Sequence, residues 1–220
     1  MIDDELEELY DYDELRRIDE PTMFEVSPTR TTLVLGSAQP SGVLSPDAAS
    51  RWAIRRRRGG GGVVALHPDD LWVDWWIPVH DPRHYDDVRA AADIVGRWWQ
   101  VALRGEGAID PSVHVGAVID DPRFRVACFT GAGPGEVFVG GRKVVGVTQW
   151  RVREGTFLST VCPVQDSRDI VAALAAPPDG LDHALDHATL ADLGVDPGAL
   201  LARLEVESGP WRHRRLILDA

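Results

Sequence analysis

Four consecutive arginines followed by four consecutive glycines form the segment of the sequence best suited to chemistry. The run covers residues 55–62 (RRRRGGGG) and leads directly into Val63-Val64. Consecutive glycines let a backbone approach a ligand closely and turn its amides toward an anion, while guanidinium groups bind carboxylates or phosphates. Flexible linkers usually border polar sequence, whereas this run borders a strand-like one. We therefore predict a loop that binds an anionic ligand, with a flexible basic loop or a nucleic-acid patch as alternatives.

Lys143 is the only lysine among the 23 cationic residues of the chain, and it lies in the segment Gly141-Arg142-Lys143-Val144-Val145-Gly146. A lysine ammonium is a compact charge with an adjustable pKa, whereas the arginine guanidinium is a planar fork that stays charged. One retained lysine therefore indicates a catalytic position. The alternative is a solvated residue of a hairpin turn.

Cys128 precedes Phe129 at the end of a strand-like run, fifteen residues before Lys143. A cation near a thiol lowers the pKa of that thiol and makes it a competent acyl acceptor. The alternative is an inert buried thiol, because free cysteines are among the most buried residues. Cys162, the second cysteine, is a weaker candidate.

No metal site is expected from the sequence. Two cysteines are too few for a zinc-binding set or a disulfide framework. His183 and His187 are four residues apart, as on one helix face, but the sequence offers no third ligand nearby.

The elements that must position these residues alternate between helix and strand patterns. Apolar residues at helical spacing over residues 85–103 predict a long helix. Three β-prone runs over residues 136–164, separated by Gly140-Gly141 and Glu154-Gly155, predict a β-meander that carries Lys143. Further strands are predicted at 31–36, within 63–79 on either side of a turn at 68–70, at 113–118 and at 125–129, and further helices at 46–55, 168–176, 188–193 and from Asp196-Pro197 through residue 207.

This order of elements predicts the α+β class, with one mixed or antiparallel β-sheet and flanking helices. The length of 220 residues fits one medium domain. We expect an acidic N-terminal arm over residues 1–23 and a single domain over residues 24–220, with a helical C-terminal extension over residues 166–220. For the arm, an amphipathic helix and a frayed segment both remain open.

The net charge of −12 belongs mainly to that arm, because residues 1–20 contain ten acidic residues and two arginines. Nucleic acid is not an expected partner, since phosphate binding needs a basic surface. No apolar run reaches the roughly 18 residues that span a bilayer, and an acidic N-terminus is unlike a signal peptide. We therefore expect a cytoplasmic protein with no membrane partner.

The motifs resemble, in order and spacing, the catalytic domain of lipoate–protein ligase A and its octanoyltransferase relatives, in the biotin/lipoate protein ligase superfamily. The resemblance rests on residues 35–39 (LGSAQ), the arginine–glycine run and residues 141–149 (GRKVVGVTQ), and it is strongest over residues 30–165. It implies the fold of that domain and the attachment of a lipoyl or octanoyl group to a lysine of a lipoyl carrier domain.

The resemblance also implies roles for single residues. Lys143 would contact the activated acyl group, and Cys128 would carry an acyl thioester in a transferase. A ligase would use ATP with Mg²⁺, whereas a transferase would need no cofactor and would take its acyl group from a donor such as an acyl carrier protein. The residues that would bind lipoate, octanoate or the adenylate are Arg55, Arg56, Gly59, Gly60, Gly61, Gly62, Gly146 and Gln149.

Two features bear on the branch of that family. The Cys-Phe pair and the lack of a separate accessory domain after residue 165 favour a transferase. Val147-Thr148 and Thr160-Val161, however, stand where the family usually has Ser-Ala and His-Gly, in the pocket wall. These departures leave room for a non-catalytic module that binds an acyl or adenylate ligand, and an unrelated α+β domain is the third alternative.

Overall fold

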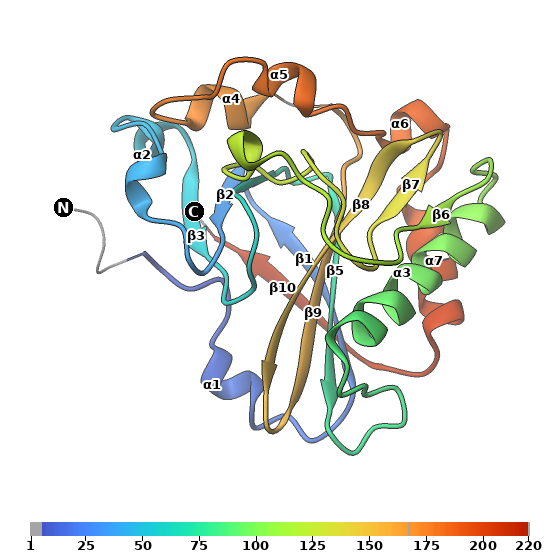
Figure 1. Ribbon diagram of the computed structural model, residues 1–220. Coiled ribbons are helices and arrows are strands. Elements are labelled where there is room, and N and C mark those ends of the chain that lie inside the picture. The colour runs from blue at the N-terminus through green and yellow to red at the C-terminus, as the bar shows by residue number, and fades with distance from the viewer. Residues whose placement is uncertain (1–5, 167, 220) are drawn as a thin grey trace.

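The computed structural model describes residues 6–166 and 168–219. The strands are β1 (Thr22–Pro28), β2 (Thr32–Leu35), β3 (Ala53–Arg56), β4 (Val64–Leu66), β5 (Leu71–Pro78), β6 (Ser112–Val113), β7 (Val137–Val139), β8 (Arg142–Val152), β9 (Gly155–Cys162) and β10 (Arg212–Leu218). The described residues form a seven-stranded mixed sheet in the order β10-β1-β5-β9-β8-β7-β6 and a three-stranded sheet in the order β3-β2-β4 (Figure 1). This arrangement with flanking helices confirms the predicted α+β class.

The long helix and the last helix cover one face of the large sheet. The helices are α1 (Tyr12–Leu15), α2 (Ala48–Arg51), α3 (Val88–Gly105), α4 (Asp169–Ala173), α5 (Leu181–Ala184), α6 (Leu190–Leu193) and α7 (Pro197–Ser208), with 3-10 turns at Ser41–Val43 and Pro122–Phe124. Asp87 caps α3 by accepting a hydrogen bond from the Ala90 amide, and Asp196 caps α7 in the same way. Apolar side chains of α3, Val95 and Trp99 among them, are fully buried against the sheet together with Leu200 and Leu204 of α7.

The predicted β-meander is confirmed as β7, β8 and β9. Gly140 and Gly141 connect β7 to β8, with φ angles of 59° and 83° that favour glycine. The β8–β9 hairpin places Lys143 near the start of β8 and Cys162 at the end of β9.

The expectation of a separate arm over residues 1–23 is corrected for the part that the structure describes. Leu9, Tyr10, Tyr12 and Leu15 are buried against the face of the large sheet opposite α3. The segment also extends the small sheet, because the Leu9 amide donates to the Arg56 carbonyl. Apolar residues between the acids therefore fix this segment to the domain, while residues 1–5 lie outside the described residues.

Three further predictions need correction. The helical part of the C-terminal extension ends with α7, because Gly209 and Pro210 end that helix. The chain then forms β10, which pairs parallel with β1. The strand predicted over residues 113–118 is limited to β6, and residues 125–129 form a loop, in which Phe129 has a φ of 68° that no strand adopts. The helix predicted over residues 46–55 spans only α2, since Trp52 is extended and leads into β3.

Among the helices of the described residues, none combines the length and the apolarity that crossing a bilayer demands.

Candidate active site

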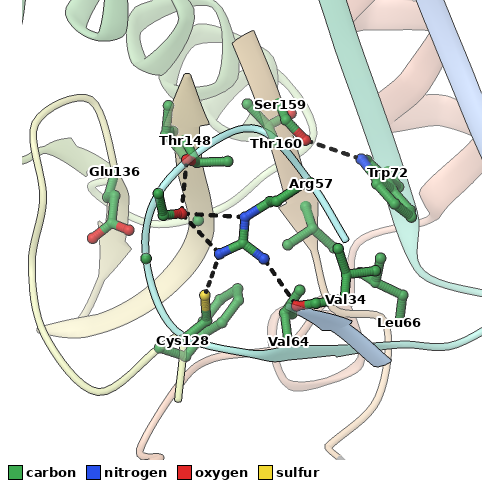
Figure 2. Close-up of a pocket in the computed structure, with 16 residues that line it drawn as sticks. Val34, Arg57, Val64, Leu66, Trp72, Cys128, Glu136, Thr148, Ser159 and Thr160 are labelled. Atoms are coloured by element: carbon green, nitrogen blue, oxygen red, sulfur yellow. Dashed lines mark hydrogen bonds between the residues drawn. The ribbon is translucent and has the colours of Figure 1, made fainter. Parts of the chain in front are cut away.

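Arg57 organises the glycine loop from within. It is the first residue after β3, and its side chain is buried under the loop, with only 5% of the residue exposed. Its guanidinium donates a hydrogen bond to the Val34 carbonyl at 3.0 Å (Figure 2). It also donates to the Gly60 carbonyl at 2.9 Å and to the Gly62 carbonyl at 2.7 Å. A buried cation thus satisfies carbonyls of a tight loop.

The glycines of the loop permit backbone contacts that a side chain would block. Gly61 has a φ of 96°, in the left-handed region that favours glycine. At Gly62 an added Cβ would lie 2.5 Å from the backbone of Ala127. Glycine at these two positions therefore has a conformational or steric cause.

The other three arginines of the run point elsewhere. Arg55 donates to the Asp219 carbonyl at 2.9 Å, and Arg56 donates to the Gln39 carbonyl at 2.6 Å. Arg58 forms an ion pair with Glu8 at 2.9 Å. In the described part of the chain, neither Arg55 nor Arg56 lines the cleft or the pocket beside the glycine loop. Arg57 lines that pocket instead.

Lys143 is held in a polar site at the floor of a cleft. Its Nζ lies 2.7 Å from Glu136 Oε2, and both side chains are largely buried. The same ammonium lies 5.4 Å from the centre of the Phe129 ring, within the range of a cation–π contact. The Gly133 amide donates to the same oxygen, Glu136 Oε2, at 2.6 Å and helps to hold the carboxylate in place.

Cys128 lies beside the glycine loop. Its Sγ is 3.6 Å from a guanidinium nitrogen of Arg57 (Figure 2). The same sulfur lies 3.0 Å from the Gly62 carbonyl. The residue is partly exposed, whereas Cys162 is fully buried, and burial raises the pKa of the Cys162 thiol well above its usual value. Of the two thiols, Cys128 alone faces a cavity together with a buried cation.

Two adjacent cavities are lined by these residues. The outer cleft, of about 1050 Å³, is lined by Gly60, Gly61, Gly62, Cys128, Lys143 and Gln149 among others. The inner pocket, of about 100 Å³, lies between the two sheets and is lined by Val34, Val64, Leu66, Trp72, Gly146 and Val161 among others. Gly60, Gly61 and Cys128 line both, so the wide cleft and the apolar inner pocket adjoin at the glycine loop.

The structure therefore brings most of the sequence-predicted site residues together. Gly59 packs against β8, where an added Cβ would lie 2.7 Å from Thr148 Oγ1. Gln149 lines the cleft through its position on β8, and its side-chain amide donates to the Val88 carbonyl at the start of α3.

Asp74 lies buried behind the inner pocket, and sequence reasoning missed it. Its carboxylate accepts hydrogen bonds from Tyr10 at 2.6 Å, Trp72 at 2.7 Å and the Thr160 amide at 3.0 Å. Burial raises the pKa of Asp74 to about 7, although these donors favour the charged form. The sequence of β5 offers a signal, since an aspartate in an otherwise apolar buried strand must find partners.

Over residues 6–166 and 168–219, no three histidine, cysteine or acidic side chains gather in a way that could hold a metal ion. The arrangement supplies a buried ammonium and a partly exposed thiol in one cleft, together with a glycine-rich backbone that adjoins an apolar pocket. Such a set can hold an acyl group and stabilise negative charge at its carbonyl.

Comparisons with known proteins identify the fold. No protein-family model matches the sequence, and no curated protein matches it either. Among solved structures, a lipoate–protein ligase A bound with ATP has a TM-score of 0.68 at 16% identity, covering 94% of this chain and 82% of its own.

Two structures from Thermoplasma acidophilum are similarly close. A lipoate protein ligase with bound lipoic acid gives a TM-score of 0.68 at 14% identity over 93% of this chain and 82% of its own. A bipartite lipoate protein ligase, studied with its E2 lipoyl domain, gives 0.67 at 16% identity over 93% of this chain and 80% of its own. The protein thus has the fold of a lipoate–protein ligase catalytic domain, as the sequence motifs predicted.

Proposed function

We propose that this protein attaches a lipoyl or octanoyl group to a lysine of a lipoyl carrier domain. One observation carries the proposal: Lys143, Cys128 and the glycine loop line one cleft, and Cys128 and the loop also line the adjoining apolar pocket. The shared fold adds support, because proteins with this fold bind lipoic acid and ATP, and one works with an E2 lipoyl domain.

In this proposal the inner pocket holds the acyl tail and the outer cleft receives the acceptor lysine. The acyl carbonyl lies where the two cavities join. Negative charge develops on its oxygen during transfer, and the ammonium of Lys143 and the amides of the glycine loop stabilise that charge. Removal of water from the apolar pocket strengthens these interactions.

The ligase route activates free lipoate or octanoate with ATP as an acyl-adenylate. The outer cleft, at about 1050 Å³, has room for a nucleotide and presents Arg89 and Lys143 as cations for phosphate. Because the described residues offer no metal-binding cluster of their own, a magnesium ion would be held chiefly by the phosphates of the nucleotide.

The transferase route uses Cys128. Its sulfur attacks the carbonyl carbon of an acyl thioester, the bond from that carbon to the donor sulfur breaks, and the donor leaves as a thiol with the proton of Cys128. The carrier lysine amine then attacks the same carbon, an amide bond forms, and the bond to the Cys128 sulfur breaks as that sulfur regains a proton. The position of Cys128 at the junction of the cavities, 3.6 Å from Arg57, supports this route.

A single experiment tests the proposal and its routes. The protein is incubated with a lipoyl domain and either lipoate and ATP or an octanoyl-carrier protein, and the lipoyl domain is weighed by intact mass spectrometry. Mass gain that requires ATP supports the ligase route. Gain from the thioester that is lost in Cys128→Ala and kept in the buried control Cys162→Ala supports the transferase route.

The Lys143–Glu136 ion pair favours a second candidate function. A carboxylate 2.7 Å from the ammonium offsets the charge that catalysis would use, which suits a module that binds an acyl or adenylate ligand without turnover. Binding of lipoate or octanoate with no mass gain from either donor would support this alternative and contradict the enzymatic proposal.

A further inference from the structure

A third cavity lies behind the inner pocket. This rear cavity, of about 40 Å³, is bordered by Ile170 and Leu185 and by two histidines, His67 and His187. The inner pocket and the rear cavity share Val64, Cys128, Phe129 and Val161 as lining residues. These four residues therefore form a wall between the two spaces.

Phe129 is the largest side chain of this wall and the one with an unusual backbone. Val64 and Val161 are held in β4 and β9, whereas Phe129 lies in a loop with a φ of 68°. Bulky residues rarely adopt this conformation, and it persists only where the surroundings fix it. The loop thus turns the Phe129 ring into the wall at a conformational cost.

The surroundings of the ring show what fixes it. A Cβ added at Gly146 would lie 3.2 Å from the ring, so the ring occupies the space above that glycine. On its other sides the ring lies 5.2 Å from the His187 ring and 5.4 Å from Lys143 Nζ. Phe129 also lines the outer cleft and is therefore common to all three cavities.

The rear cavity is suited to hydrocarbon near the wall and is polar at its far end. Ile170 and Leu185 supply apolar surface. His67 lies 3.2 Å from Asp70 and 3.0 Å from Asp169, and the hydrogen bond to Asp70 is the main cause that raises the pKa of His67 to about 9. The charged His67 is thus paired with two carboxylates, so it offers no unpaired cation that would attract a carboxylate.

We propose that Phe129 sets the longest unbranched acyl chain that the site accepts, by closing the inner pocket against the rear cavity. The inference rests on the proposed function, since it takes the inner pocket as the acyl-tail site. Removal of the ring joins the two cavities, and each further methylene that becomes buried tightens binding by roughly fourfold.

The test is isothermal titration calorimetry with octanoate, decanoate, dodecanoate and tetradecanoate, without ATP, donor or carrier protein. We expect the wild-type affinity to stop rising at a given chain length, and we expect Phe129→Ala to move that limit to longer chains. Phe124→Ala is the matched control, because it removes a ring from the same loop that lines none of the three cavities. It should leave the limit unchanged.

Two variants keep the test decisive if Phe129→Ala folds poorly. Phe129→Leu keeps an apolar side chain and should move the limit by a smaller step. Gly146→Ala keeps the Phe129 side chain but adds a methyl group 3.2 Å from its ring, which displaces the ring. This variant should therefore also change the chain-length limit.

The outcomes separate this inference from the proposed function. An unchanged limit in Phe129→Leu and Gly146→Ala, with acyl transfer retained, overturns the role of Phe129 alone. A shifted limit without any transfer to a lipoyl domain supports the role of Phe129 and overturns the enzymatic proposal. Failure of every acid to bind overturns the role of Phe129 and the ligase route, and the thioester arm of the mass assay then decides the transferase route.

Discussion

Glu136 Oε2 lies 2.7 Å from Lys143 Nζ at the floor of the cleft, and this ion pair joins the loop before β7 to β8. A substrate oxygen that acquires negative charge must compete with Glu136 for the ammonium. The carboxylate therefore orients Lys143 in the free protein and also limits how strongly the lysine can act.

Removal of the cation alone should harm both stability and activity. Lys143→Met leaves Glu136 largely buried without its partner, which we expect to cost about 3 kcal/mol in the free energy of unfolding. Acyl transfer should fall by about a hundredfold or more. The double variant Lys143→Met/Glu136→Gln should recover most of the stability but none of the transfer, as measured by urea unfolding and by the mass assay. Recovery of transfer in the double variant would contradict a catalytic role for Lys143.

The planar guanidinium geometry of Arg57 should contribute more to the stability of the protein than its positive charge does. Arg57→Lys keeps a cation but cannot reach three carbonyls in the same geometry, so we expect a loss of about 3 kcal/mol in the free energy of unfolding. Arg55→Lys, with exposed partners, should lose less than about 1 kcal/mol. Urea unfolding of the two variants checks this difference, and equal losses would show that the loop does not depend on Arg57.

The two cysteines should differ sharply in reactivity. Cys128 is partly exposed at the cleft, whereas Cys162 is 0% exposed and burial raises the pKa of its thiol. Iodoacetamide should therefore alkylate Cys128 in the folded protein and should reach Cys162 only after unfolding. Peptide mass spectrometry of the labelled protein measures both sites. Early labelling of Cys162 would mean that the β9 end opens readily.

Asp74 should give stability a specific pH dependence. Its carboxyl has a pKa of about 7 when folded, against 3.8 as its ordinary value, so the folded state holds the proton more tightly. This contribution is fully present below about pH 4 and is lost as the pH rises to about 7, by roughly 1.4 kcal/mol per pH unit at most.

Asp74→Asn removes that titration. From about pH 5 to about pH 8, the variant should gain roughly 2–3 kcal/mol in unfolding free energy relative to the wild type. Asp69→Asn, at an exposed turn position, is the control and should show no such change. A constant difference between Asp74→Asn and wild type across this range would contradict a raised pKa at Asp74.

Local patterns were enough to predict the elements whose residues contact mainly their neighbours in sequence. The helical spacing of apolar residues placed α3, and paired glycines placed the β7–β8 turn. β10 was missed because its four basic residues hide an alternation in which Arg214, Leu216 and Leu218 turn inward. β10 pairs with β1, which is nearly the whole chain away in sequence. Such a long-range contact cannot be predicted from a local sequence pattern.

Most residues that line the candidate site were predicted from the sequence, but the separate positions of its four arginines were not. Lys143 was singled out by being the only lysine, and Cys128 and the glycines follow from their chemistry. Among four consecutive arginines, however, the buried one is decided by where β3 ends, which depends on its register with β2. The sequence alone therefore could not separate Arg57 from Arg55 and Arg56.

The guanidinium of Arg57 holds the glycine loop in place before any ligand arrives. A free glycine loop would lose roughly 1–2 kcal/mol of conformational entropy per residue when a ligand ordered it. Here that loss occurs during folding instead, so it does not weaken binding. Ligand affinity at this site should consequently reflect apolar burial and charge, and the heat-capacity change on binding should report the inner pocket alone.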